Sequence, residues 1–261
     1  MHNRSNLIQV QPIYSQREEW KELAERYDLK FEVLELSGPL VLNRDERPVE
    51  IFDQYLKSGL VTSLHGCFID VNPGSGDDLF RKLSFQRMQE SCELAVYLGA
   101  KNVVFHSACA SFLRGAYLKS WAVRSAECFK ELASAYDLNI FVENSMDVDP
   151  DPILELLHMI DNPRVNVCLD IGHVQYSRCS QEQWFEALGD RIGYLHLSDN
   201  DGLFDDHLAI GQGCINWKKA DSLWRALGRD VPVTIETNTI ENVEQSLEYL
   251  MKNELFGIVN M

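Results

Sequence analysis

Short runs of apolar residues alternate along the chain with longer segments in which apolar residues recur at helical spacing. The short runs are rich in β-branched and aromatic residues, which is typical of strands, and the longer segments have the period of amphipathic helices. The pattern predicts eight strands and eight helices in strict alternation. The predicted strands cover residues 7–13, 31–36, 61–66, 102–107, 139–144, 165–173, 192–200 and 231–237.

The predicted helices carry local start and stop signals. Ser15 and Glu18 have the spacing of a capping box, and Gly99 follows the longest helical segment. A proline lies in the first turn of the helix predicted at 151–161. The predicted helices cover residues 15–28, 48–59, 78–99, 117–136, 151–161, 180–190, 216–228 and 240–253.

This alternation is compatible with two architectures, a closed barrel and an open doubly wound sheet. Several predicted strands are apolar at nearly every position, as expected when both faces of a sheet are covered. An open sheet binds ligand at one switch point with two or three loops. Here polar residues end strands three to eight, and only a closed barrel brings all those ends together. We therefore predict an α/β fold, a single-domain (β/α)₈ TIM barrel over residues 1–261.

The polar residues at the strand ends are of the types that bind metals. A lone histidine or acid at such a place commonly caps a helix or packs in the core. A joint set is different, because carboxylates gathered around one axis repel each other unless a cation lies between them. The pattern predicts a divalent metal site with nitrogen and oxygen ligands. The nine candidate ligands are His65, His106, Glu143, Asp170, His173, His196, Asp205, His207 and Glu236.

Composition indicates which partners and which cellular compartment to expect for this protein. The chain has 40 acidic and 24 basic residues, and its net charge of −16 argues against non-specific attraction to nucleic acid or anionic lipid. We see neither a signal-peptide core nor an apolar run long enough for a membrane span. Seven scattered cysteines without a C-x-x-C motif suggest free thiols in a reducing compartment. These features predict a cytoplasmic protein.

The strand-end motifs resemble those of the xylose isomerase-like TIM-barrel superfamily, which includes sugar isomerases, sugar epimerases and endonuclease IV. The matching pieces are LHGCF, VVFHS, VENS, CLDIGH, YLHLSDN, DDHLAIGQG and IET. For the isomerase and epimerase branch, the resemblance implies one Mn²⁺, Co²⁺, Mg²⁺ or Zn²⁺ ion. Its ligands would be Glu143, Asp170, His196 and Glu236. Glu143 and Glu236 would also move protons at a carbon next to a carbonyl, with His173 orienting a substrate oxygen and His65, His106 and His207 handling substrate.

Two other activities of the family remain open. In the endonuclease IV branch, all nine positions bind up to three Zn²⁺ ions and the enzyme hydrolyses an abasic-site phosphodiester. Every one of the nine matches here. An inosose dehydratase-like lyase would use the single-metal site to eliminate water. A barrel that only senses metal or sugar is the non-enzymatic alternative.

The surroundings of the site favour a small substrate. A DNA enzyme needs lysine and arginine around its mouth, and the predicted mouth loops are acidic instead, at Asp70, Asp77, Asp78, Asp147, Asp149, Asp201, Asp205 and Asp206. The basic candidates are Arg44, Arg47, Arg114, Lys119 and Arg178. Arg114 is the best candidate for gripping a substrate phosphate or carboxylate. We expect a metal-dependent sugar or sugar phosphate isomerase or epimerase, with no nucleic-acid or membrane partner and with homo-oligomerisation left open.

Overall fold

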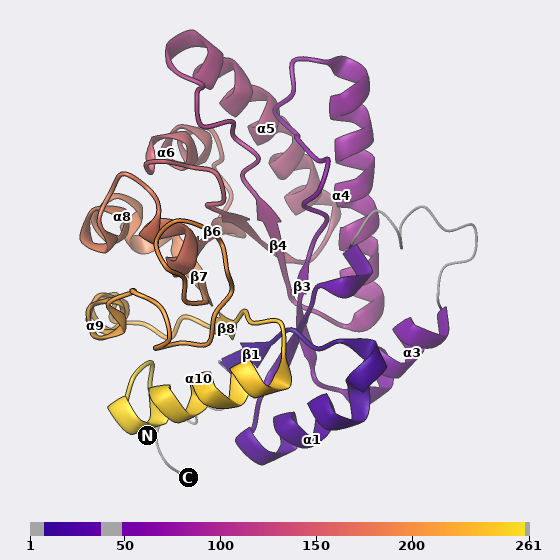
Figure 1. Cartoon of the computed structure of the whole chain (residues 1–261). Coiled ribbons are helices and arrows are strands. Elements are labelled where there is room, and N and C mark those ends of the chain that lie inside the picture. Colours follow the sequence, from indigo (N-terminus) through magenta and orange to yellow (C-terminus); the bar gives the residue numbers. More distant parts are fainter. Residues whose placement is uncertain (1–7, 38–48, 259–261) are drawn as a thin grey trace. The chain divides into compact units, whose positions relative to one another are not determined.

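The computed structural model of the protein describes residues 8–37 and 49–258 (Figure 1). Eight parallel strands follow one another in chain order around a closed barrel, with helices between them. The predicted (β/α)₈ fold is therefore confirmed. The chain forms two compact units, residues 31–167 and residues 1–30 with 168–261. That the whole chain is one domain stays a prediction.

The unit of residues 31–167 contains four neighbouring strands in parallel register. β4 and β5 pair along their whole length, and this register places His106 opposite Glu143. The long helices α4 and α5 pack on each other and cover β3, β4 and β5 (Figure 1). The strands are β2 (Lys30–Val33), β3 (Val61–His65), β4 (Asn102–His106) and β5 (Asn139–Glu143). The helices are η3 (Glu35–Ser37), α3 (Val49–Ser58), α4 (Asp78–Leu98), α5 (Gly115–Ala135) and α6 (Asp151–His158).

The other unit joins the two ends of the chain. β1 pairs in parallel with β8, so that Ile8 lies opposite Val233, and β7 pairs with the other edge of β8. Helices α1 and α10 lie side by side in this unit (Figure 1), where Arg26 pairs with Glu244. The strands are β1 (Ile8–Val10), β6 (Val165–Asp170), β7 (Ile192–Leu197) and β8 (Val233–Ile235). The helices are η2 (Tyr14–Gln16), α1 (Arg17–Tyr27), α7 (Ile171–Gln175), α8 (Gln181–Leu188), η4 (Gly189–Arg191), α9 (Trp217–Ala226) and α10 (Ile240–Asn253).

Two predicted elements differ from the structure for local reasons. The capping box at Ser15 and Glu18 is wrong, because a 3₁₀ turn precedes α1 and moves the N-cap to Gln16, which makes no side-chain cap. The strand predicted to reach residue 173 ends at Asp170. The Asp170 carboxylate accepts a hydrogen bond of 2.5 Å from the backbone N–H of His173, which caps the short helix α7. This cap turns the chain so that an aspartate and a histidine leave the strand end together.

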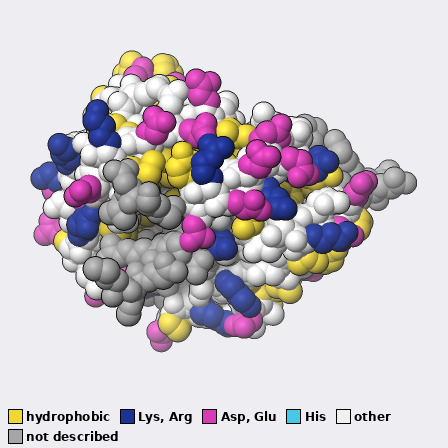
Figure 2. All heavy atoms as spheres, turned by 90° about the horizontal axis from the view of Figure 1, so that it is seen from below, with side chains coloured by type: hydrophobic (Ala, Val, Ile, Leu, Met, Phe, Trp, Pro, Cys, Tyr) yellow, Lys and Arg dark blue, Asp and Glu magenta, His cyan; other side chains and the backbone are white. Residues whose placement is uncertain are grey.

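The surface carries both signs of charge. On the face shown in Figure 2, lysine and arginine side chains are interspersed with aspartate and glutamate. The negative net charge is thus not gathered into one patch on that face. Within residues 8–37 and 49–258, no helix has the length and apolar character needed to cross a bilayer.

Candidate metal centre

Three ligand-type side chains meet at the ends of β3, β4 and β5. The Glu143 Oε2 atom lies 3.3 Å from His65 Nε2 and 3.6 Å from His106 Nε2. The register between β4 and β5 explains the second contact, since His106 and Glu143 are strand partners. His65 and Glu143 are almost completely buried, with exposed fractions of 2% and 1%. We call these three residues the β3–β5 group.

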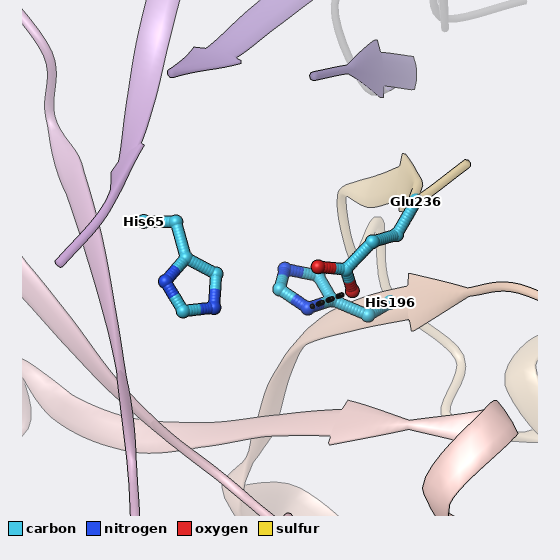
Figure 3. Close-up of side chains that lie close together, drawn as sticks. All are labelled: His65, His196 and Glu236. Atoms are coloured by element: carbon cyan, nitrogen blue, oxygen red, sulfur yellow. Dashed lines mark ion pairs between the residues drawn. The ribbon is translucent and has the colours of Figure 1, made fainter. Parts of the chain in front are cut away.

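A backbone contact prepares the ring of His65, whose side chain is drawn in Figure 3, to bind a cation. Its Nδ1 atom lies 2.9 Å from the backbone oxygen of Gly66, which can only accept, so Nδ1 carries a proton. In a neutral ring, Nε2 is then a bare acceptor that faces the Glu143 carboxylate. Histidines that bind metals commonly donate their other ring N–H to a backbone carbonyl in this way. The β3–β5 group therefore fits a metal by its donor chemistry.

A second group is formed by residues at the ends of β6, β7 and β8. Ligand atoms of Asp170, His196 and Glu236 all lie within 4.8 Å of one another. Figure 3 shows one pair of this group, in which His196 Nδ1 is 2.9 Å from Glu236 Oε2. Gln11 donates a hydrogen bond of 3.0 Å to the other oxygen of Glu236 and so fixes its orientation. We call Asp170, His196 and Glu236 the β6–β8 group.

The β6–β8 group also fits a divalent metal. Asp170 and His196 have no exposed surface, and Glu236 is 7% exposed. Two carboxylates held this close in a buried place repel each other, and a divalent cation among them would remove that repulsion. One imidazole and two carboxylates suit Zn²⁺, Mn²⁺ and Co²⁺ by ligand type. The predicted ligand role of these residues has a geometric basis but stays a prediction.

The two remaining candidate histidines, His173 and His207, form a third group with Asp205. Its Oδ2 atom lies 3.2 Å from His173 Nε2 and 3.1 Å from His207 Nε2, and His207 Nδ1 contacts the backbone oxygen of Glu236 at 2.9 Å. Burial acts against the charged forms, but hydrogen bonds with the two histidines outweigh it and lower the pKa of Asp205. The hydrogen bond with Asp205 and the charge of Glu236 likewise outweigh burial and raise the pKa of His207 to about 10. We call these three residues the His–Asp–His group.

Several predicted mouth residues have other roles in the structure. The Arg114 guanidinium donates to the carbonyls of Ser111 and Leu113 and pairs with Asp149 at 3.4 Å, so its charge is partly engaged within its own loop. Its predicted grip on substrate stays a prediction. Asp147 is buried and accepts a hydrogen bond of 2.5 Å from Ser107. Arg44 and Arg47 lie outside the described residues.

The aromatic side chains divide into exposed and buried ones. Phe68 packs against the rings of both His65 and His106, with centroids 5.2 Å apart in each pair. Phe112 and Phe204 are mostly exposed, whereas Trp217 is buried. Phe68 is thus the aromatic residue placed to form a wall of the β3–β5 group.

Sequence reasoning missed the residues that hold the candidate ligands in place. Gln11 contacts Glu236 across 225 positions of sequence, and its only signal is a polar residue inside an apolar strand-like run. Asp199 is fully buried and accepts four hydrogen bonds in the loop that carries Asp205 and His207. Nothing in the sequence distinguishes it from the exposed aspartates that follow it.

Comparisons with known proteins place the chain in a family. A family described as "Xylose isomerase-like TIM barrel" matches residues 2–253. An uncharacterised protein of Methanocaldococcus jannaschii is 28% identical over 223 residues, which are 81% of this chain and 74% of that protein. Fructoselysine 3-epimerase of Escherichia coli O157:H7 is 26% identical over 148 residues, about half of each chain (53% and 53%).

A solved structure extends the likeness to the whole fold. A protein from Thermus thermophilus, studied after soaking with ZnCl₂, superposes with a TM-score of 0.79 at 23% identity, covering 98% of this chain and all (100%) of that chain. At this identity the likeness shows the fold alone. Taken with the match over residues 2–253, it leads to one conclusion: the chain belongs to the xylose isomerase-like TIM-barrel family.

Proposed function

We propose that the protein is a metal-dependent sugar isomerase or epimerase that moves a proton at a carbon next to a carbonyl. The β6–β8 group carries the proposal, because it holds two buried carboxylates and an imidazole at ligand spacing. The relation to fructoselysine 3-epimerase supports this reaction class. The acidic loop residues favour a neutral sugar over a phosphorylated one, since aspartates repel a phosphate dianion.

The closed barrel supports one shared centre built from several strands. In such barrels the carboxyl ends of all strands open on the same mouth, where active sites are built. We propose that Glu143 joins Asp170, His196 and Glu236 as a ligand of one Mn²⁺, Co²⁺, Mg²⁺ or Zn²⁺ ion. Once bound, this ion would act as a Lewis acid that polarises the substrate carbonyl and acidifies the neighbouring C–H.

The proton transfers fall to the two glutamates. Glu236 is held by Gln11 and His196, so its carboxylate can remove a proton without first reorienting. Glu143 would return a proton on the opposite face of the substrate, giving epimerisation, or at the adjacent carbon, giving isomerisation. His173 and His207 would hold substrate oxygens, and His65 and His106 would line the site beside Phe68.

Solvent exchange tests this proposal directly. Metal-loaded protein in D₂O is incubated with a panel of ketoses, and proton NMR follows loss of the signal at the carbon next to the carbonyl. We expect exchange with at least one sugar, and loss of exchange in Glu143→Gln and Glu236→Gln. Glu248→Gln, an exposed glutamate of α10, is the matched control. Full exchange activity in Glu236→Gln would refute the two-glutamate mechanism, and release of water from the sugar would indicate a dehydratase instead.

A zinc phosphodiesterase of the endonuclease IV kind is the second candidate. The observation that favours it is that two further ligand groups, the β3–β5 group and the His–Asp–His group, are assembled in addition to the β6–β8 group. Three such groups could hold up to three Zn²⁺ ions. Two or three Zn²⁺ per chain by elemental analysis, with cleavage of an abasic-site oligonucleotide, would place this candidate first.

A further inference from the structure

The loop between β7 and α9 is folded around one buried carboxylate. Asp199 Oδ1 accepts hydrogen bonds from the backbone N–H groups of Asn200 (3.0 Å) and Ile215 (3.2 Å). Its Oδ2 accepts from the Gly211 N–H and the Trp217 indole N–H, both at 2.8 Å. The side chain is fully buried, and residues 198–217 contain no lysine or arginine. Four N–H donors thus take the place of a cation for this carboxylate.

The same residue also ties the loop through its backbone. Asp199 and Leu208 exchange two hydrogen bonds, of 3.0 and 2.8 Å, in an isolated antiparallel bridge. Leu208 directly follows His207, whose backbone is left-handed with φ of 48°. Such a conformation costs free energy for a non-glycine residue and persists only where its surroundings hold it. The bridge at Leu208 supplies that restraint.

Neighbouring contacts connect this arrangement to the His–Asp–His group. Asn200 donates a hydrogen bond of 2.9 Å to the backbone oxygen of Gly172, which precedes His173. A Cβ atom at Gly213 would lie 2.2 Å from Asp199 Oδ1, so the loop backbone is closely packed on the carboxylate. The loop therefore has little freedom to move while these hydrogen bonds persist.

We propose that Asp199 is a positioning residue, which fixes the β7–α9 loop so that Asp205 and His207 are held against His173 and Glu236. It does not itself touch the reacting atoms. Its effect on catalysis rests on the proposed function, in which His173 and His207 hold substrate oxygens. Its effect on the conformation of the loop does not depend on the proposed function.

Asp199→Asn is the sharpest variant, because it keeps the size of the side chain but removes its charge and replaces one acceptor oxygen with an NH₂ donor. Each carboxylate oxygen accepts two N–H groups, so an amide in either orientation points its NH₂ at two donors. We expect loss of amide hydrogen-exchange protection at Gly211 and Ile215, and altered imidazole NMR signals of His207. A displacement of about 1 Å can cost about 100-fold in rate, so we expect kcat/KM to fall by about that factor.

Two further variants complete the test, one with a milder expected effect and one as a control. Trp217→Phe removes one of the four donors and should cause a smaller loss of kcat/KM, about three- to tenfold. Asp206→Asn, an exposed aspartate of the same loop, should change none of these readouts. If Asp199→Asn does not fold, Trp217→Phe still tests the proposal. Wild-type protection and wild-type His207 signals in the folded variants would overturn it. Exchange and imidazole signals need no substrate, so an absence of sugar activity would refute only the proposed function.

Discussion

Metal should stabilise the folded protein, and the β6–β8 group sets the size of the effect. Oxygen atoms of Asp170 and Glu236 lie within 4.8 Å of each other. At the effective dielectric constant of about 20 that describes such sites, two unit charges at this distance repel by about 3.5 kcal/mol. The metal-free protein carries this repulsion in its folded state, and a bound cation removes it.

The effect of metal binding on the free energy of unfolding follows from mass action. A ligand present at about 100 times its Kd adds about 2.7 kcal/mol to the free energy of unfolding. For a chain of this size, that corresponds to a rise in Tm of about 5–10 °C. We expect this rise when Mn²⁺, Co²⁺, Mg²⁺ or Zn²⁺ is added to chelator-treated protein at pH 7.5 and unfolding is followed by scanning calorimetry.

The variant Glu236→Gln tests whether Glu236 binds the metal or only packs in the site. The substitution removes one of the two repelling charges, so the metal-free variant should be at least as stable as the metal-free wild type. It should also lose most of the metal-dependent rise in Tm. Glu248→Gln should keep the full rise. Equal shifts in wild type and Glu236→Gln, or no shift in wild type with any of the four metals, would refute the assignment.

Three other outcomes test separate parts of the structure. The pKa of His207 is raised from 6.5 to about 10, so this group stabilises the metal-free fold fully below pH 6.5 and loses that effect as pH rises through 10; unfolding curves of wild type and His207→Gln should converge over this interval. Gly213→Ala places a Cβ atom 2.2 Å from Asn200 O and should lower the urea-unfolding free energy by about 1–3 kcal/mol. Iodoacetamide should label the exposed Cys214 before Cys67 in the native protein, because Cys67 is buried and burial raises the pKa of its thiol to about 11. Mass spectrometry after proteolysis identifies the labelled site, and early labelling of Cys67 would contradict the packing.

The fold and the candidate ligands were accessible from sequence because they depend on local pattern. An apolar β-branched run followed by histidine or an acid marks a strand end in a parallel barrel. The parallel register then brings the ends of neighbouring strands together, as with His106 and Glu143. The same reasoning cannot detect partners that are distant in sequence. The contact between Gln11 and Glu236 depends on β1 pairing with β8, which no local window contains.

Loop residues were less predictable because their environment is set by backbone groups. Asp147 was expected at an acidic mouth, yet it is buried and bound by Ser107 and the Ser145 N–H. Trp217 follows the same kind of polar loop, and its indole is buried against Asp199. In both cases the deciding partner is a hydrogen-bonding group that carries no signal in residue type or spacing.

The pairing of β1 with β8 has a consequence for how the chain is made. Ile8 and Val233 are separated by 225 positions (233 minus 8), so their pairing closes almost the whole polypeptide into a ring. Closing a loop of that length costs about 5 kcal/mol of chain entropy at 25 °C. During synthesis, β1 leaves the ribosome long before β8 exists, whereas β2 to β5 can pair as they emerge. A chain truncated before β8 would therefore leave the barrel open, with β1 and β7 each lacking the neighbour that β8 provides.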